Sequence, residues 1–110
     1  MASNQSNASA QYNLGLMYSE GQGVPQDHVE GLVWYRRAAD QGNASAQFSL
    51  GIMYANGYGI TRDYVEAYKW TLLAEMNGKD VTNTKDWLKK LLTESQIAQA
   101  QEAAREVFSK

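Results

Sequence analysis

Apolar residues recur along the chain at the spacing of one face of an α-helix, every third or fourth position. The first two stripes are Ala10, Leu14, Met17 and Tyr18, and then Gly31, Trp34, Tyr35 and Ala38. Polar residues occupy the positions between them. The pattern predicts two amphipathic helices, over about 7–19 and 27–41, joined by a loop that contains two glycines and a proline.

Polar residues with capping propensity mark the expected helix ends. Asn7 or Ser9 can cap the first helix, so we expect it to begin there and residues 1–6 to be frayed. Asp27 and Glu30 have the spacing of a capping box at the start of the second helix. A glycine inside the first helix, Gly15, costs roughly 1 kcal/mol relative to alanine, which indicates a packing role.

The stretch 7–42 is followed directly by a second copy of itself. Residues 43–78 repeat it at an offset of 36 positions without insertion, and 17 of the 36 positions are identical. Chance similarity would not keep two segments aligned without a gap over such a length. A period of this size is typical of helical solenoids, in which each helical hairpin packs on its neighbour. The second copy predicts helices over about 44–55 and 63–77.

The tail departs from the repeat but remains helical in pattern. A short helix is expected over 84–92, and the Thr93–Gln96 spacing predicts a capping box that opens a helix to about Phe108. The expected apolar sides are Trp87, Leu88, Leu91 and Leu92, and then Ile97, Ala100, Ala104, Val107 and Phe108. We therefore predict one all-α domain over 1–110: an α-solenoid with repeat one at 7–42, repeat two at 43–78 and a capping hairpin at 79–110.

Composition narrows the possible functions. The 110 residues carry a net charge of −2 and no cysteine, so a basic surface for nucleic acid and thiolate metal sites are not expected. No apolar run approaches the ~20 residues of a membrane span. The start of the chain has neither the basic nor the apolar region of a signal peptide. We expect a soluble protein and leave open its compartment and a targeting segment removed from this chain.

The candidate catalytic groups have simpler explanations. Asp27 with Glu30, and Asp63 with Glu66, could be taken as paired carboxylates for acid–base catalysis, but helix capping accounts for their spacing. His28 is the only histidine and is expected on an exposed first turn. We expect the lysines of the short helix, Lys85 among them, to lie on a solvent-exposed face. We predict no enzyme activity, no metal and no cofactor.

Three motifs together resemble a known repeat family. Leu-Gly-x-x-Tyr, Gly-x-Gly-Val and Trp-Tyr start at Leu14, Gly21 and Trp34, and their order and spacing are similar to the Sel-one-like repeat, a branch of the tetratricopeptide superfamily. The resemblance covers 8–42 and 44–78. It implies a stack of helical hairpins that acts as a protein-interaction adaptor and binds a peptide or protein segment on its concave face.

The resemblance also places the candidate binding residues, which lie beside the Leu of each Leu-Gly pair. They are Tyr12, Asn13, Leu16, Phe48, Ser49 and Ile52. The alternative is that Tyr12 and Phe48 pack between hairpins. Two other functions stay open: a polysaccharide or cell-wall-binding module that uses loop aromatics such as Tyr58, and, least favoured, a small hydrolase. In the first case, substitutions at Phe48 and Ile52 should leave sugar binding unaffected.

The first helix has no cap before it. Its outer face, with Ala8, Gln11, Tyr12 and Gly15, is expected to be open. We therefore expect the chain to be a piece of a longer array or to form a homo-oligomer through this helix.

Overall fold

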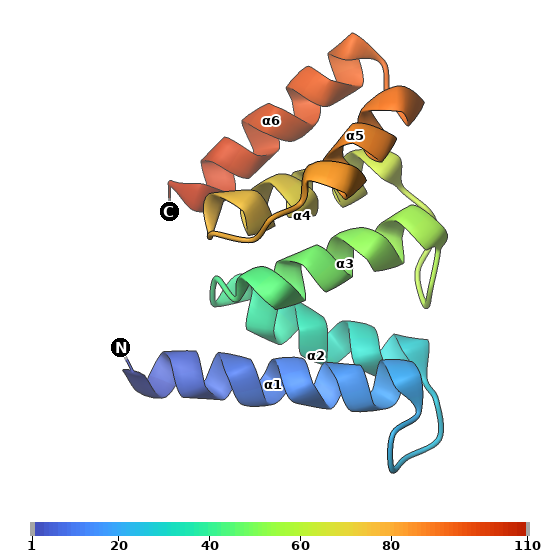
Figure 1. The fold of residues 1–110 in the computed structure, drawn as a ribbon, viewed down its shortest axis with the longest axis vertical. Helices are drawn as coiled ribbons and strands as arrows, with labels where there is room; N and C mark the ends of the chain where they lie inside the picture. Colours follow the sequence, from blue (N-terminus) through green and yellow to red (C-terminus); the bar gives the residue numbers. More distant parts are fainter. Residues whose placement is uncertain (1, 110) are drawn as a thin grey trace.

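The protein is a stack of α-helices. A computed structural model describes the backbone of residues 2–109 and the side chains of residues 7–109. Residues 2–109 form six helices and no strand, in agreement with the all-α prediction (Figure 1). The helices are α1 (Ala2–Glu20), α2 (His28–Asp40), α3 (Ala44–Asn56), α4 (Tyr64–Met76), α5 (Thr82–Leu91) and α6 (Glu94–Phe108).

Each repeat forms one antiparallel hairpin. Helices α1 and α2 pack together, α3 and α4 pack together, and α2 packs against α3 to join the hairpins (Figure 1). The last two helices close the stack differently from the expected capping hairpin. Both α5 and α6 pack mainly against α4 rather than against each other, and α6 makes the larger contact.

Aspartates cap the second helix of each hairpin as expected. The carboxylate of Asp27 accepts from the backbone N–H of Glu30 at 3.1 Å, and Asp63 caps α4 in the same way. In neither of these described turns is the reciprocal bond of a capping box formed. The backbone N–H of Asp27 donates instead to Tyr18 O at 2.8 Å, and that of Asp63 to Tyr54 O at 3.0 Å. These two bonds fasten each loop to the helix before it.

Two helices begin earlier than predicted. Helix α1 begins at Ala2 rather than near Asn7 or Ser9, because its first residues include no glycine or proline that would break it. In contrast, Gly42 ends α2 with a φ of +87°. Helix α5 begins at Thr82 because the Asp80 carboxylate accepts from its backbone N–H at 3.1 Å and from its hydroxyl at 2.8 Å.

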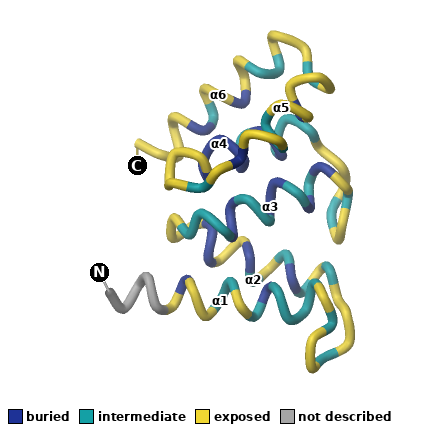
Figure 2. Tube along the Cα trace, in the orientation of Figure 1, coloured by how far each residue is buried: buried dark blue, intermediate teal, exposed yellow. Residues whose placement is uncertain are grey.

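The core follows the repeated positions, but the second repeat is buried more deeply. Leu50 and Trp70 are 1% and 2% exposed, whereas Leu14 and Trp34 are only half-buried. Buried positions, in dark blue, gather in α3 and α4 (Figure 2). The second repeat has neighbours on both sides, and the first has a neighbour on one side only. Of the eight positions expected in the core, Ala38, Leu50, Trp70 and Ala74 are buried and Leu14, Tyr18, Trp34 and Tyr54 are half-buried.

The predicted apolar sides of the tail are buried only in part. Leu88, Ala100 and Ala104 are fully buried, and Leu92 and Ile97 pack at the edge of the core. The prediction is wrong for Trp87, Leu91, Val107 and Phe108, which are all exposed. In α6 only the two alanines are fully buried, and the larger Val107 and Phe108 lie exposed at its C-terminal end.

The repeated glycines of the first helices have a packing role, as predicted. A Cβ on Gly51 would lie 3.1 Å from the backbone oxygen of Ala67 and 2.9 Å from Thr71 Oγ1, so the backbones of α3 and α4 approach closely. At Gly15 the reason differs. A Cβ there would lie 2.5 Å from Cδ1 of Tyr35, whose ring fills the space in the first hairpin.

Candidate functional site

A groove runs between the first helices of the two hairpins. We call it the α1–α3 groove; its volume is about 290 Å³. Most of the surface that lines it is apolar. Its lining residues are Leu16, Ser19, Glu20, His28, Tyr35, Phe48, Ser49, Ile52, Met53 and Tyr58.

Four of the six predicted binding residues lie together in this groove, namely Leu16, Phe48, Ser49 and Ile52. The other two lie outside it. The ring of Tyr12 packs against Tyr35 of its own hairpin, with 5.7 Å between the ring centroids. Asn13 is exposed on α1. The groove therefore begins one helical turn further along α1 than the sequence suggested.

One end of the groove is formed by two aromatic rings that were not predicted. His28 stacks on Tyr58 with 4.9 Å between ring centroids and 13° between the ring planes. The prediction of an exposed His28 is wrong, because its ring is half-buried and its Nδ1 has no hydrogen-bond partner in the described part of the chain. The contact joins the start of α2 to the loop of the next hairpin. It forms only when the two hairpins stack, so it is not evident from the sequence around either residue.

Tyr35 contributes to the lining from α2. It is 3% exposed, and burial raises the pKa of its hydroxyl, while the hydroxyls of Ser19 and Ser49 act in the opposite direction. The hydroxyl therefore stays neutral near pH 7. Glu20 is the only Asp, Glu, Lys or Arg among the groove residues.

Phe48 also lines a second, smaller cavity of about 250 Å³ at the start of α5, together with residues 80–84. The ammonium group of Lys79 lies 5.5 Å from the centroid of the Phe48 ring. Asp80 lies at this cavity, and hydrogen bonds from Thr82 lower the pKa of its carboxyl. Phe48 therefore lines both the α1–α3 groove and this smaller cavity.

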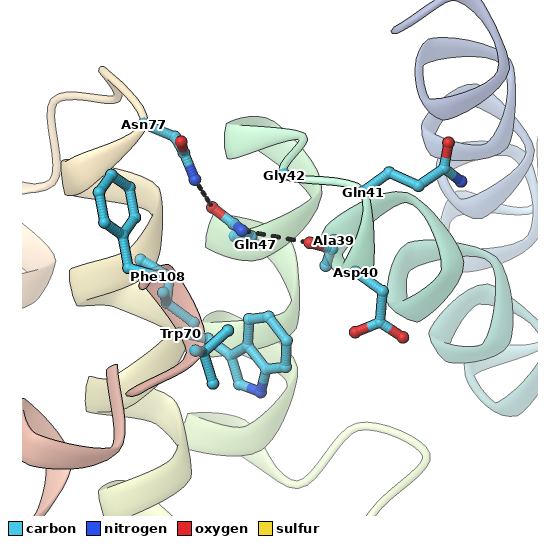
Figure 3. Close-up of a pocket in the computed structure, with 10 residues that line it drawn as sticks. Ala39, Asp40, Gln41, Gly42, Gln47, Trp70, Asn77 and Phe108 are labelled. Carbon is cyan, nitrogen blue, oxygen red and sulfur yellow. Dashed lines mark hydrogen bonds between the residues drawn. The ribbon is translucent and has the colours of Figure 1, made fainter. Parts of the chain in front are cut away.

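A third cavity, of about 280 Å³, lies where α2, α4 and α6 end (Figure 3). The amide of Gln47 crosses it and bonds to Ala39 O at 3.2 Å and to Asn77 Nδ2 at 3.0 Å. Phe108 borders it and is half exposed. These groups join the helices to one another and leave little polar capacity for a ligand.

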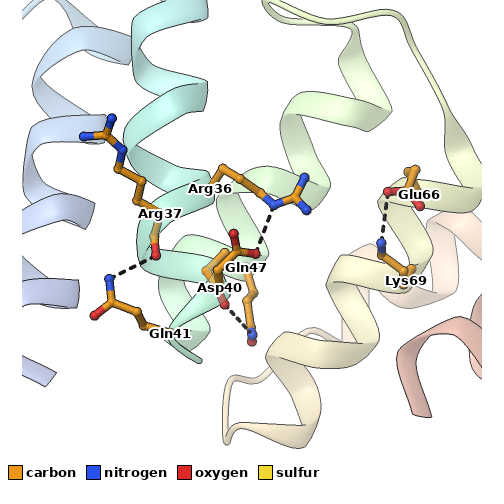
Figure 4. A network of polar contacts seen from close by, with 8 residues as sticks. Arg36, Arg37, Asp40, Gln41, Gln47, Glu66 and Lys69 are labelled. Atoms are coloured by element: carbon orange, nitrogen blue, oxygen red, sulfur yellow. Dashed lines mark hydrogen bonds and ion pairs between the residues drawn. The ribbon is translucent and has the colours of Figure 1, made fainter. Parts of the chain in front are cut away.

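Most charges near this third cavity and along the second helices are paired. Arg36 bonds to Asp40 at 3.0 Å, and Lys69 bonds to Glu66 at 3.0 Å (Figure 4). Lys85, predicted as part of a solvated face, instead joins α5 to α4 through an ion pair with Glu75 at 3.0 Å.

The described residues offer no catalytic constellation. Asp27 and Asp63 cap helices, and no group of three or more His, Cys, Asp or Glu side chains among the described residues could hold a metal ion. Within that same part of the chain, every helix is too short or too polar to cross a membrane. The arrangement is suited to holding an apolar group in the groove without forming a covalent bond.

Comparison with known proteins agrees with this architecture. Residues 8–43 and 44–79 each match the family model of the Sel1 repeat. A protective antigen of uropathogenic Escherichia coli with an SLR fold matches 94% of this chain at 36% identity, with a TM-score of 0.89. A Sel1 repeat protein from Oxalobacter formigenes matches 71% of it at 40% identity, with a TM-score of 0.65. Curated protein sequences give no match.

The chain is much shorter than these solved proteins. It spans 22% of the length of the first and 32% of the length of the second.

Proposed function

Because the chain belongs to the Sel1 repeat family, we propose that it binds a peptide or protein segment non-covalently, and that the α1–α3 groove holds this segment. The observation that carries the proposal is the groove itself. Leu16, Phe48 and Ile52 come from two different hairpins and line one apolar hollow. Such a hollow, with a few polar groups at its edges, is the usual form of a binding site.

The size of the groove favours a short anchor. A volume of about 290 Å³ is at the lower end of ligand pockets, which suits one or two apolar side chains rather than the whole face of a helix. The hydroxyl of Ser49 lies beside the apolar residues and can bond to the backbone of the segment, whereas Ser19 Oγ is buried against α2. Asn13 and Tyr12 lie nearer the start of α1 and would contact the segment where it leaves the groove.

We further propose that the protein has no catalytic activity of its own. The family is generally an interaction fold, and the two carboxylate pairs that could suggest acid–base chemistry are at helix starts. Neither pair is among the residues that line the groove.

A panel of aspartate variants tests the binding proposal. A displayed library of random linear peptides is selected on the full chain, and the affinities of the selected peptides are then measured by calorimetry. Ile52→Asp and Phe48→Asp should each weaken binding by about 30-fold or more, because burial of a charge opposite an apolar anchor costs at least ~2 kcal/mol. Val33→Asp, on the exposed side of α2 and outside the groove, is the matched control.

Unchanged affinity in both groove variants, with the fold intact by circular dichroism, would remove the groove as the binding site. A loss of the same size in Val33→Asp would show that the charge acts non-specifically.

A cell-wall or polysaccharide ligand is the less favoured alternative. Tyr58 would be the stacking ring, but His28 already covers one of its faces. Tyr58 also lies in the same groove as Ile52, so substitutions at Phe48 and Ile52 do not separate the two functions as the sequence suggested. Tyr58→Leu separates them better, because it keeps the apolar character that a peptide needs and removes the flat ring on which a sugar stacks.

A further inference from the structure

The α1–α3 groove carries one acidic side chain at its edge. Glu20 is the last residue of α1, lines the groove and is exposed. Its Oε1 accepts a hydrogen bond from Gln22 Nε2 at 2.8 Å, and this donor is neutral. Within residues 7–109, the four ion pairs all involve other carboxylates, so Glu20 has no cationic partner there. Its charge is therefore available to a ligand in the groove.

Helix stability does not account for this charge. The C-terminal end of a helix has a partial negative charge, so a glutamate is unfavourable there. Helix α1 has no basic residue in its last turn to compensate. At the equivalent position the second repeat has Asn56, which is neutral. The charge of Glu20 is thus particular to the first hairpin and is not part of the repeated architecture.

The first part of the chain has no positive side chain that offsets Glu20. Residues 1–35 contain Glu20, Asp27 and Glu30 and no Lys or Arg, whereas residues 36–110 contain nine acidic and ten basic residues. Burial is the main cause that raises the pKa of the Tyr35 hydroxyl inside the groove, and the negative charge of Glu20 acts in the same direction. The field of Glu20 therefore reaches into the groove and favours a positive group there.

The position of Glu20 also sets its distance from the apolar part of the groove. Leu16 and Glu20 are four residues apart on α1, which places them on one face of the helix and about 6 Å apart along its axis. Alternate side chains of an extended peptide point to the same side and are about 6.6 Å apart. An extended segment with an apolar side chain against Leu16 therefore brings the side chain two positions away close to Glu20.

We infer that the α1–α3 groove selects an extended segment in which a Lys or Arg stands two positions from an apolar anchor. The anchor lies against Leu16, Phe48 and Ile52, and the Lys or Arg pairs with the carboxylate of Glu20. This inference rests on the proposed function and names the chemical class of its partner. An exposed ion pair adds little affinity, but an acidic side chain at the same place is repelled, so Glu20 acts mainly in the choice between segments.

Peptide selection on variants of the full chain tests this inference. Displayed random linear peptides are selected on the natural chain and on Glu20→Lys. Peptides from the natural chain should be enriched in Lys or Arg two positions from an apolar residue. Peptides from Glu20→Lys should carry Asp or Glu at that position instead, because the charge opposite is reversed. Glu106→Lys, on an exposed part of α6 outside the groove, is the matched control and should select the same basic peptides as the natural chain.

Calorimetry gives a second measurement with one selected peptide and a variant of it that has Gln in place of the basic residue. Glu20→Gln should weaken binding of the basic peptide by about 2-fold to 5-fold, as expected for an exposed ion pair. The same substitution should leave the affinity for the Gln variant unchanged. Higher ionic strength should reduce the difference between the two peptides, because salt screens exposed charges.

The possible results separate this inference from the proposed function. Selected peptides that bind Ile52→Asp weakly but have no basic residue two positions from the anchor would overturn only the choice of a basic segment. Equal affinity of the basic peptide for the natural chain and for Glu20→Gln would have the same consequence. If no peptide is selected, or if neither Ile52→Asp nor Phe48→Asp weakens binding, both the proposed function and this inference are wrong.

Discussion

A single methyl group added at Gly15 tests how the first hairpin is packed. Gly15 lies in the middle of α1, where alanine would normally stabilise the helix by about 1 kcal/mol. In the structure a Cβ at this position would lie 2.5 Å from Cδ1 and 2.7 Å from Cε1 of Tyr35. Tyr35 is 3% exposed and its ring is held among core residues, so it cannot move aside freely.

The two effects have opposite signs, and the contact distances decide between them. Ordinary contacts of a Cβ begin near 3.4 Å, so the ring would overlap the new methyl group by almost 1 Å. Overpacking of this kind costs about 1–3 kcal/mol. After the gain in helix propensity is subtracted, Gly15→Ala should lower the free energy of unfolding by about 0–2 kcal/mol.

A double-mutant cycle measured by urea unfolding shows whether the ring is responsible. The second repeat has Thr71 where the first has Tyr35, so Tyr35→Thr is the natural small substitute. In that background Gly15→Ala should become neutral or stabilise by up to about 1 kcal/mol. Stabilisation by Gly15→Ala in the natural chain, or an equal loss in both backgrounds, would show that the ring does not restrict this position.

Three further results are expected. Thr93→Ala should lower the free energy of unfolding by about 1 kcal/mol, because it removes the capping box with Gln96, whereas Ser95→Ala should change it little; thermal unfolding of both variants checks this. Tyr68→Phe should be neutral or stabilising in the same assay, because the Tyr68 hydroxyl is buried without a partner among the described residues. Burial also raises the pKa of Tyr35 and Tyr68. The stability that this provides is present below the unfolded pKa near 10 and is lost as pH rises through the folded pKa values. The urea midpoint of the natural chain should therefore fall in alkaline buffers. The midpoint of Tyr68→Phe should fall less, because one of the two hydroxyls is absent.

Local signals in the sequence were sufficient for most helix boundaries. The Thr93–Gln96 capping box forms as predicted, since both partners lie within one turn. Asp27 and Asp63 cap their helices for the same reason. The glutamates that follow them do not complete the box, because the loop brings each aspartate N–H to a tyrosine carbonyl of the preceding helix. That contact depends on the folded loop and is not evident from spacing.

Contacts between hairpins were the part that the sequence did not reveal. His28 and Tyr58 stack across two repeats, 30 positions apart, and nothing in their local sequence links them. Phe108 continues the apolar stripe of α6, and its 53% exposure is likewise not evident from its local sequence. Four of the six residues that the family resemblance placed beside the Leu of each Leu-Gly pair line the groove between α1 and α3, whereas Tyr12 and Asn13 lie outside it.

The two copies of the repeat also separate architecture from binding. Some positions that pack in both hairpins are identical, such as Gly15 with Gly51, where a Cβ would clash with the second helix of the same hairpin, and Ala38 with Ala74, which are both fully buried. The six proposed binding residues form three equivalent pairs, and the members of every pair differ. The pairs are Tyr12 and Phe48, Asn13 and Ser49, and Leu16 and Ile52. Each pair keeps a similar chemical character while its shape changes, and four of the six residues (Leu16, Phe48, Ser49 and Ile52) line the α1–α3 groove.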